Sequence, residues 1–236
     1  MEWVTKNISN YIHICHKAYN SWFYFRIFKK NKYYRMILEH VSKKQGQLYL
    51  DNIDDSYNQY MHIFKKNDKI GFPKKYRYKI GRFSPTTLRY IKVLSDLNHN
   101  CYLYSPVLLN IIEIGGGYGG QCLIINQFTN FKSYKIFDLP IVNKLQRKYL
   151  NFHNVKNVKF NHLIKKNTCD LIISNYAWSE FDKELRDKYT ENILRNAKHG
   201  YITINRNIEQ CISELKDIKS ISIRDDVIKD CKIIEW

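Results

Sequence analysis

The sequence predicts an α/β protein in which a helical N-terminal region precedes a mostly parallel sheet of seven strands. From residue 110 onward, short apolar runs alternate with helical stretches, which is the pattern of strand–helix units in a parallel sheet. Before residue 65, apolar residues recur at helical spacing instead. The predicted strands are 110–114, 134–137, 157–160, 170–174 and 200–204, with 220–223 and 231–235 as the closing pair.

The N-terminal region is predicted to be helical. Residues 5–65 read as two or three amphipathic helices, interrupted by the polar stretch 51–55. Glycines and a proline over residues 71–81 indicate a loop. The Ser84-Pro85 pair then predicts a helix N-terminus, with serine as the N-cap and proline in the first turn, and the helix should run to about Leu97.

Composition limits the class of protein. At 236 residues and 44% hydrophobic, the chain can bury one substantial core and a small appendage. No apolar run has the length of a membrane-spanning helix, and the first residues do not resemble a signal peptide. The cysteines include no C-x-x-C pair, which argues against a zinc site or disulfide framework and predicts buried thiols in a reducing cytoplasm. They are Cys15, Cys101, Cys122, Cys169, Cys211 and Cys231.

The net charge of +17 admits several interpretations. An anionic partner would explain it: nucleic acid, a nucleotide-sugar, a pyrophosphate-linked glycan or an acidic membrane face. Basic residues alternate with aromatic ones over 26–35 and 74–79, and such stretches can bind single-stranded nucleic acid. They can equally form helices whose aromatic face packs in the core while the lysines are solvated, which is the interpretation we favour.

A glycine cluster is the most informative stretch. The predicted strand 110–114 contains Glu113 and leads into glycines at 115–117, 119 and 120, which allow a tight turn and a close approach of the backbone to a ligand. The second strand delivers Asp138, 19 positions after Gly119 (138 − 119). An acidic residue at this place binds ribose hydroxyls in nucleotide-binding α/β sheets, so we expect an adenosine-containing cofactor.

The identity of the cofactor depends on Glu113. The glycine cluster also satisfies the dinucleotide pattern G-x-G-x-x-G, which alone is weak evidence, and a glycine-rich turn without a ligand is the alternative. Glu113 stands two residues before the first glycine, giving the Glu-x-Gly-x-Gly-x-Gly form typical of class I methyltransferases. A carboxylate there would attract a cationic methionine amine and would not help a pyrophosphate. The cluster also begins only after about 110 residues, which is late for a dehydrogenase. These features favour S-adenosylmethionine over NAD.

Four motifs in order sharpen this prediction. They are 84–90 (SPTTLRY), 137–150 (FDLPIVNKLQRKYL), 170–180 (DLIISNYAWSE) and 200–205 (GYITIN). Together they resemble the sugar O-methyltransferases of bacterial and large-virus glycan clusters, over roughly residues 70–205. The resemblance implies a Rossmann-like class I methyltransferase sheet at 84–236 behind a helical cap, 1–83, that shapes the acceptor site. Gly71-Phe72-Pro73 departs from the family, which has a polar residue between glycine and proline.

Site residues follow from the predicted sheet, because ligands bind beyond the carboxyl ends of parallel strands. His199 precedes the fifth strand at the opposite edge and is expected to be an ordinary polar residue. Asn205 and Arg206 follow that strand and are predicted to contact the acceptor. The predicted cofactor contacts are Glu113, Gly115, Gly116, Gly117, Tyr118, Asp138, Leu139, Asn161, His162, Ser174 and Asn175.

The loop after the fourth strand is predicted to carry the chemistry. A sugar hydroxyl is a weak nucleophile, so a general base or a metal ion should assist its methylation. Glu180 is the predicted base and Tyr176 a positioning residue, while the alternative is that Tyr176 packs and Glu180 is only a helix-start acid. Asp182 fits the start of the next helix better. No compact carboxylate cluster indicates a metal site, so we expect metal independence.

The resulting hypothesis is a cytoplasmic O-methyltransferase that methylates a sugar hydroxyl of a glycan or its precursor. The cofactor product is S-adenosylhomocysteine, and the acceptor can bear phosphate. An RNA or nucleotide 2′-O-methyltransferase is the alternative, supported by charge alone. After the fourth strand Ser174-Asn-Tyr-Ala stands in place of [DNS]-P-P-[YFW], which argues against base N-methylation. A non-enzymatic, cofactor-binding scaffold is a third hypothesis, against which the acidic residues 113 and 138 argue.

Overall fold

The computed structural model describes residues 2–100, 102–103 and 108–236, and the chain in it forms two compact units. The boundaries between them cross helix α6 (Pro85–His99) and the glycine turn. The predicted division at residues 83 and 84 stays a prediction. The first unit comprises Met1–Asp96, Gly117–Thr129 and Leu139–Lys156, and the second comprises Leu97–Gly116, Asn130–Asp138 and Asn157–Trp236.

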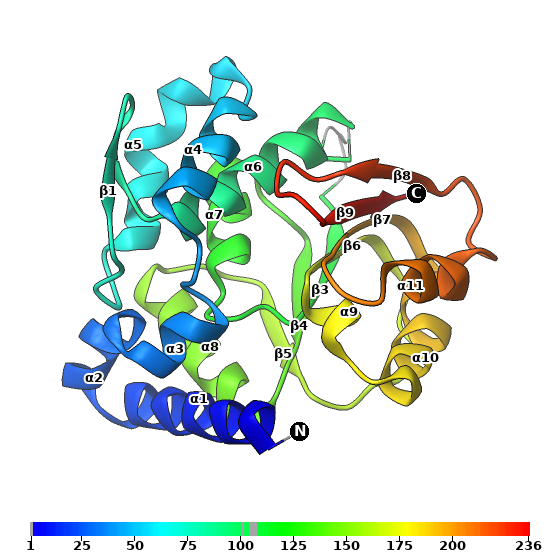
Figure 1. Cartoon of the computed structure of the whole chain (residues 1–236), viewed down its shortest axis with the longest axis horizontal. Helices are drawn as coiled ribbons and strands as arrows, with labels where there is room; N and C mark the ends of the chain where they lie inside the picture. Colours follow the sequence, from blue (N-terminus) through cyan, green and yellow to red (C-terminus); the bar gives the residue numbers. More distant parts are fainter. Residues whose placement is uncertain (1, 101, 104–107) are drawn as a thin grey trace. The chain divides into compact units, whose positions relative to one another are not determined.

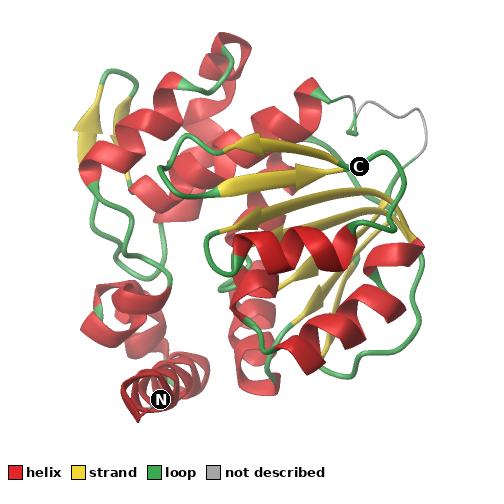
Figure 2. Ribbon diagram, turned by 45° about the vertical axis from the view of Figure 1, so that its right-hand side comes forward, coloured by secondary structure: helices red, strands yellow, loops and turns green. Residues whose placement is uncertain are grey.

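The second unit contains a seven-stranded sheet in the order β5-β4-β3-β6-β7-β9-β8 (Figures 1 and 2). The strands β5, β4, β3, β6 and β7 pair in parallel, whereas β9 runs antiparallel to both of its neighbours. The predicted α/β class with a mostly parallel, Rossmann-like sheet is therefore confirmed. The strands are β3 (Asn110–Ile114), β4 (Ser133–Phe137), β5 (Val158–Asn161), β6 (Cys169–Asn175), β7 (Ala197–Ile204), β8 (Ser222–Asp225) and β9 (Lys232–Glu235).

Among the strand starts of this sheet, that of β7 differs most from prediction. β3 coincides with the predicted segment, and all but the first of its residues are buried. β7 begins at Ala197, three residues before the predicted start, and Lys198 and His199 in this extension are exposed. A strand end that faces solvent carries no apolar signal, so the sequence pattern could not reveal it.

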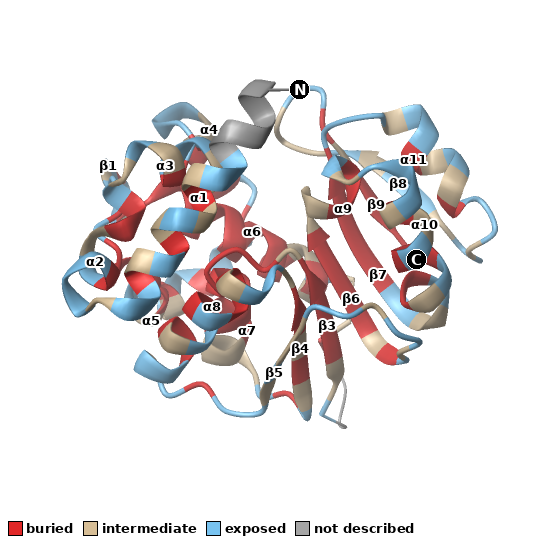
Figure 3. Cartoon of the chain, turned by 90° about the horizontal axis from the view of Figure 1, so that it is seen from below, coloured by how far each residue is buried: buried red, intermediate tan, exposed pale blue. Residues whose placement is uncertain are grey.

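One face of the sheet is buried by helices of the same unit. These are α9 (Ala177–Glu180), α10 (Lys183–Asn192) and α11 (Ile208–Leu215). Isoleucines of the central strands pack there with Trp178, Tyr189 and Leu215 from the helices. The middle strands are coloured as buried along most of their length in Figure 3. This core fixes the strand ends from which the candidate site residues project.

The first unit is helical, but its helices are shorter and more numerous than predicted. Polar N-caps interrupt the pattern: Ser21, Asn31 and Ser42 each accept a hydrogen bond from the first turn of the helix that follows. A hairpin also replaces part of the predicted loop, where Tyr76–Tyr78 pairs with Gly81–Phe83. The elements are α1 (Glu2–Asn20), α2 (Trp22–Ile27), α3 (Lys32–Ile37), α4 (Lys43–Asp51), α5 (Met61–Phe64), β1 (Tyr76–Tyr78), β2 (Gly81–Phe83), α7 (Gly120–Phe128) and α8 (Pro140–Phe152).

The predicted start of helix α6 is confirmed. The Ser84 hydroxyl accepts the backbone N–H of Thr87 at 3.2 Å, and Pro85 occupies the first helical position. The buried carboxylate of Asp68 accepts hydrogen bonds from the Ser84 amide, the Ser84 hydroxyl and the Thr87 hydroxyl, each at 2.7 Å. This ties the 3-10 turn Lys65–Asp68 to the start of the helix.

The cysteines that the structure describes are buried and form no disulfide bonds among themselves; they are Cys15, Cys122, Cys169, Cys211 and Cys231. Cys101 lies outside the described residues. Within the described parts of the chain, no helix combines the length and apolar character needed to cross a membrane.

Candidate functional site

Three of the predicted cofactor residues meet at the carboxyl edge of the sheet in the second unit. The amide of Gly115 donates to the carbonyl of Phe137 at 2.9 Å, and the amide of Asp138 donates to the carbonyl of Asn161 at 3.0 Å. These bonds continue the parallel ladders by one residue beyond the strands, so Gly115, Asp138 and Asn161 lie on neighbouring strand ends, roughly 5 Å apart from one strand to the next.

Glu113 lies within β3, where only 2% of its surface is exposed. The hydroxyl of Tyr134 on β4 donates to its Oε2 atom at 2.9 Å. Burial raises the pKa of Glu113 to about 8, with the Tyr134 hydrogen bond opposing the shift and the nearby charge of Asp138 adding to it. A carboxyl group with this pKa is largely protonated near pH 7, and a cation bound at the strand end would favour its charged form.

The turn after β3 requires glycine at its first position. Gly115 has a φ of +72°, which non-glycine residues rarely adopt, and a Cβ atom there would collide with the Cβ atom of Ala177. Ala177 opens α9, which follows β6. The backbone at Gly115 therefore stays free of a side chain beside the carboxyl groups of Glu113 and Asp138.

The hydroxyl of Ser174 joins β6 to β3. It donates to the Ile114 carbonyl at 3.3 Å and accepts the amide of Trp178 at 3.1 Å. Ser174 is buried, so these two bonds anchor the start of α9 beside the glycine turn. Its neighbour Asn175 is half-buried, and its Oδ1 atom accepts a hydrogen bond from Thr203 of β7 at 3.5 Å.

Tyr176 adopts a strained backbone conformation at the end of β6. Its φ is +71°, which is uncommon for a residue with a Cβ atom and often occurs at functional sites. Its hydroxyl donates to Asp226 at 3.2 Å, and its carbonyl accepts from the Ser179 hydroxyl at 2.8 Å. Ser179 also donates to Asn205 at 3.3 Å, which links the loops that follow β6 and β7.

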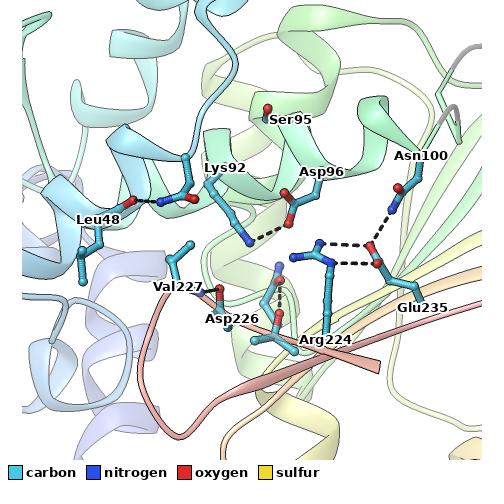
Figure 4. Close-up of polar contacts among 12 residues, drawn as sticks. Leu48, Lys92, Ser95, Asp96, Asn100, Arg224, Asp226, Val227 and Glu235 are labelled. Atoms are coloured by element: carbon cyan, nitrogen blue, oxygen red, sulfur yellow. Dashed lines mark hydrogen bonds and ion pairs between the residues drawn. The ribbon is translucent and has the colours of Figure 1, made fainter. Parts of the chain in front are cut away.

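The loop between β8 and β9 supports this arrangement (Figure 4). Asp226 accepts the backbone amide of Val227 at 2.7 Å, which orients the carboxylate that receives the Tyr176 hydroxyl. Glu235 at the end of β9 accepts hydrogen bonds from Arg224 at 3.0 Å and from Asn100 at 2.7 Å. Both strands of the closing pair are therefore fixed by buried or half-buried polar contacts.

Glu180 is the exposed last residue of α9. The segment after it is held firmly, because Arg186 donates to the Phe181 carbonyl at 2.6 Å and forms a two-point ion pair with Glu214 at 2.8 and 2.9 Å. Asp182 accepts the amide of Leu185 and caps α10, as predicted. Glu180 thus sits on an anchored turn with its carboxylate open to solvent.

The other predicted polar residues of this edge are open to solvent. His162, Asn205 and Arg206 are exposed, and Asn161 is half-buried. His199 lies near the amino end of β7, as expected, where its ring stacks on Tyr102 with a centroid distance of 4.8 Å. The exposed set can contact a ligand without any rearrangement of the core.

Three predicted cofactor residues belong to the first unit. Gly117 has a φ of +56°, and its carbonyl accepts a hydrogen bond from Gln146 of α8 at 3.0 Å. The side chain of Tyr118 is fully buried, so only its backbone is left to serve a ligand. Leu139 is exposed at the start of α8.

A buried lysine contacts the Tyr118 ring, and its burial was not predicted from the sequence. The Nζ atom of Lys29 lies 3.6 Å from the ring centroid of Tyr118 and donates to the Asn67 carbonyl at 3.0 Å. The side-chain amide of Asn67 donates to the Tyr118 hydroxyl at 3.0 Å. Lys29 stands in a basic stretch that was interpreted as solvated, and nothing in the sequence separates it from the exposed Lys30.

The buried ammonium of Lys29 is balanced by two carboxylates of the first unit. Burial lowers its pKa, while the charges of Glu39 and Asp68 raise it. Burial raises the pKa of Glu39, which the charge of Lys29 opposes. This cluster stabilises the segment that contains Gly117 and Tyr118.

No group of three or more His, Cys, Asp or Glu side chains is arranged to bind a metal ion within the described residues.

Comparisons with known proteins identify related folds only. No family model and no curated protein sequence matches the chain. Among solved structures, an O-methyltransferase family protein from Burkholderia thailandensis is 12% identical over 63% of this chain, with a TM-score of 0.46, and the match spans 57% of that protein's length. A SAM-dependent methyltransferase from Aquifex aeolicus is 16% identical over 59% of this chain and 88% of its own, with a TM-score of 0.46. Neither identity is high enough to transfer an activity or a substrate.

Glu113 should make stability depend on pH. Its folded pKa of about 8 lies above the ordinary value of 4.5, so the unfolded chain loses this proton first as pH rises. The group stabilises the fold fully at low pH, and this contribution falls by at most about 1.4 kcal/mol per pH unit until pH passes the folded pKa. Urea unfolding of Glu113→Gln should lack this decline, so the variant gains stability relative to the native chain as pH rises from about 5 to about 8. If the free energy of unfolding changed with pH in the same way in both proteins, the raised pKa of Glu113 would be contradicted.

Proposed function

We propose that the carboxyl edge of the sheet in the second unit binds S-adenosylmethionine. The observation that carries this is the placement of Glu113 and Asp138 on adjacent parallel strands, around a Gly115 backbone that cannot bear a side chain. This pair suits a ligand with a cationic amine and a sulfonium, because such a cation favours the charged form of Glu113. A pyrophosphate would disfavour that charged form and would be repelled by the carboxylate of Asp138. The geometry therefore supports this cofactor over a dinucleotide.

The roles proposed for the individual residues follow their strand ends. Asp138 accepts hydrogen bonds from the ribose hydroxyls, as acidic residues after the second strand do in nucleotide-binding sheets. Asn161 is the last residue of β5 and His162 follows it, and both serve the adenine side. Gly115, Gly116, Ser174 and Asn175 serve the methionine side. Gly117, Tyr118 and Leu139 stay predicted contacts on the basis of the sequence.

The proposed reaction is methylation of a sugar hydroxyl in a glycan or its precursor. The acceptor oxygen attacks the methyl carbon in line with sulfur, the carbon–sulfur bond breaks, and its electron pair stays on sulfur to give S-adenosylhomocysteine. Glu180 accepts the hydroxyl proton and Tyr176 positions the acceptor. Asn205 and Arg206 bind the acceptor, and the exposed guanidinium of Arg206 suits one that carries phosphate.

The same proposal assigns the cofactor and the acceptor to different parts of the chain. Residues 84–236 bind the cofactor, and residues 1–83 form the acceptor-binding region. The resemblance to sugar O-methyltransferases supports this assignment.

Asp138→Ala tests the cofactor assignment. Loss of a charge-assisted hydrogen bond should weaken S-adenosylhomocysteine binding by about 1.5–3 kcal/mol, or roughly 10- to 150-fold. Isothermal titration calorimetry measures this directly, and NAD should bind the native chain far more weakly. Asp225→Ala is the matched control, because Asp225 is an exposed residue of β8 whose partner is Lys232. Tighter binding of NAD, or equal affinities in both variants, would reject the cofactor.

The acceptor class requires a separate experiment. Transfer of a labelled methyl group should be assayed against simple sugars, nucleotide-sugars and short RNA in parallel. Methylated sugar supports the proposal, and a preference for nucleotide-sugars points to an acceptor phosphate at Arg206. If only RNA were methylated, the sugar acceptor would be rejected in favour of the RNA 2′-O-methyltransferase alternative.

A further inference from the structure

An aromatic and basic surface on the first unit has no role in the proposed reaction. Its centre is α2, where Trp22 is 54% and Phe23 is 66% exposed. Tyr24 of the same helix, Tyr19 at the end of α1 and Phe152 at the end of α8 are also exposed. We call these five side chains the α2 surface. Figure 3 shows the exposed residues along α2.

Four of the five rings of the α2 surface form contacting pairs, and the end of α1 beside them is held by hydrogen bonds. The Trp22 ring lies 5.8 Å from that of Phe152, and the Phe23 ring lies 5.6 Å from that of Tyr24. Lys148 of α8 donates to the carbonyls of Ala18 at 2.9 Å and Tyr19 at 2.7 Å, which fixes the end of α1 against α8. Large apolar side chains at this exposure are unusual on a surface that binds nothing.

The segments that carry the α2 surface are basic. Residues 3–38 contain seven Lys or Arg residues, of which Lys29 is buried, and no Asp or Glu. Residues 139–156 contain four Lys or Arg residues and no acid. Two of these lysines lie directly over exposed rings: Lys17 is 5.2 Å from the Tyr24 centroid and Lys144 is 5.6 Å from the Tyr19 centroid. The partner that fits is therefore anionic and offers apolar volume beside its charges.

We propose that the α2 surface binds the face of an anionic lipid bilayer, with Trp22 and Phe23 inserted among the acyl chains and the surrounding lysines on lipid phosphates. Aromatic rings next to cationic side chains are characteristic of membrane interfaces. Single-stranded nucleic acid fits less well, because bases stack on free ring faces. Here Phe23 and Tyr24 pack edge to face, and ammonium groups lie over Tyr24 and Tyr19.

Vesicle co-sedimentation of the full chain tests the proposal. Binding is expected to vesicles of phosphatidylcholine mixed with phosphatidylglycerol, to weaken with salt, and to be far weaker to phosphatidylcholine alone. Trp22→Ser/Phe23→Ser should reduce binding at least about tenfold. Lys17→Gln/Lys144→Gln should reduce vesicle binding by about fivefold per charge. This second variant tests the proposal even if the aromatic variant misfolds.

Ile223→Ser is the matched control, because Ile223 is an exposed apolar residue of β8 in the second unit, and its binding should equal that of the native chain. S-adenosylhomocysteine affinity should be the same in all of these variants, so failure of the surface proposal stays distinct from failure of the cofactor proposal. Equal binding by the native chain and both double variants would overturn the proposal. Absence of vesicle binding, with single-stranded RNA binding lost in the Trp22/Phe23 variant, would assign the surface to nucleic acid instead.

Discussion

Replacing Lys29 by methionine is expected to lower the free energy of unfolding by about 3–5 kcal/mol at pH 8. The ammonium is fully buried, lies over the Tyr118 ring and balances the charges of Glu39 and Asp68. Methionine fills a similar volume but leaves both carboxylates without their cation. The loss should shrink near pH 6, where Glu39, whose pKa burial already raises, is readily protonated. Urea unfolding at the two pH values measures both effects.

The neighbouring lysine and a double variant make this test specific. Lys30→Met, one residue along the chain and exposed, should change stability by no more than about 0.5 kcal/mol. In Lys29→Met/Glu39→Gln the loss at pH 8 should be partly recovered, because the uncompensated carboxyl is gone. A loss in Lys29→Met that is independent of pH and not recovered in the double variant would show that Lys29 acts through packing and not through charge.

Replacing Glu180 by glutamine is expected to lower turnover by about 10²- to 10⁴-fold while cofactor affinity stays nearly unchanged. Glutamine preserves the shape of the side chain and removes only its ability to accept the acceptor's proton. The turn that carries Glu180 is anchored by Ser174, Ser179 and Arg186, so its position should not change. Steady-state rates with the acceptor found in the methyl-transfer assay provide the measurement.

Asp182→Asn is the control for Glu180. It changes the nearest other carboxylate on the same segment, and asparagine still caps the helix, so its turnover should match that of the native chain. Near-normal turnover in Glu180→Gln would make Glu180 a structural residue. The base would then be sought at His162, and Asn205 would be tested as a positioning residue; both are exposed at neighbouring strand ends.

Strand positions were the most predictable part of the fold. β3 contains three isoleucines and is followed directly by glycine, so its limits were predictable from the sequence. The placement of Gly115 and Asp138 beyond adjacent strand ends followed from these limits. The helical region was less predictable. The N-caps at Ser21 and Asn31 depend on side-chain oxygens that turn back onto the backbone, which the apolar spacing does not report.

The fold class and the residues that meet at the strand ends were predictable, because the apolar period and the glycine cluster are local properties of the chain. Which charged residues are buried could not be predicted in this way. Lys29 and Lys30 are adjacent residues of the same type in the same basic stretch. Lys29 nevertheless lies over the Tyr118 ring, whereas Lys30 is exposed to solvent. The same holds for Phe25, which is buried, and Phe23, which is exposed. Burial depends on contacts with segments far away in the chain, such as Asn67 for Lys29 and Phe152 for Phe25, and these contacts exist only after folding.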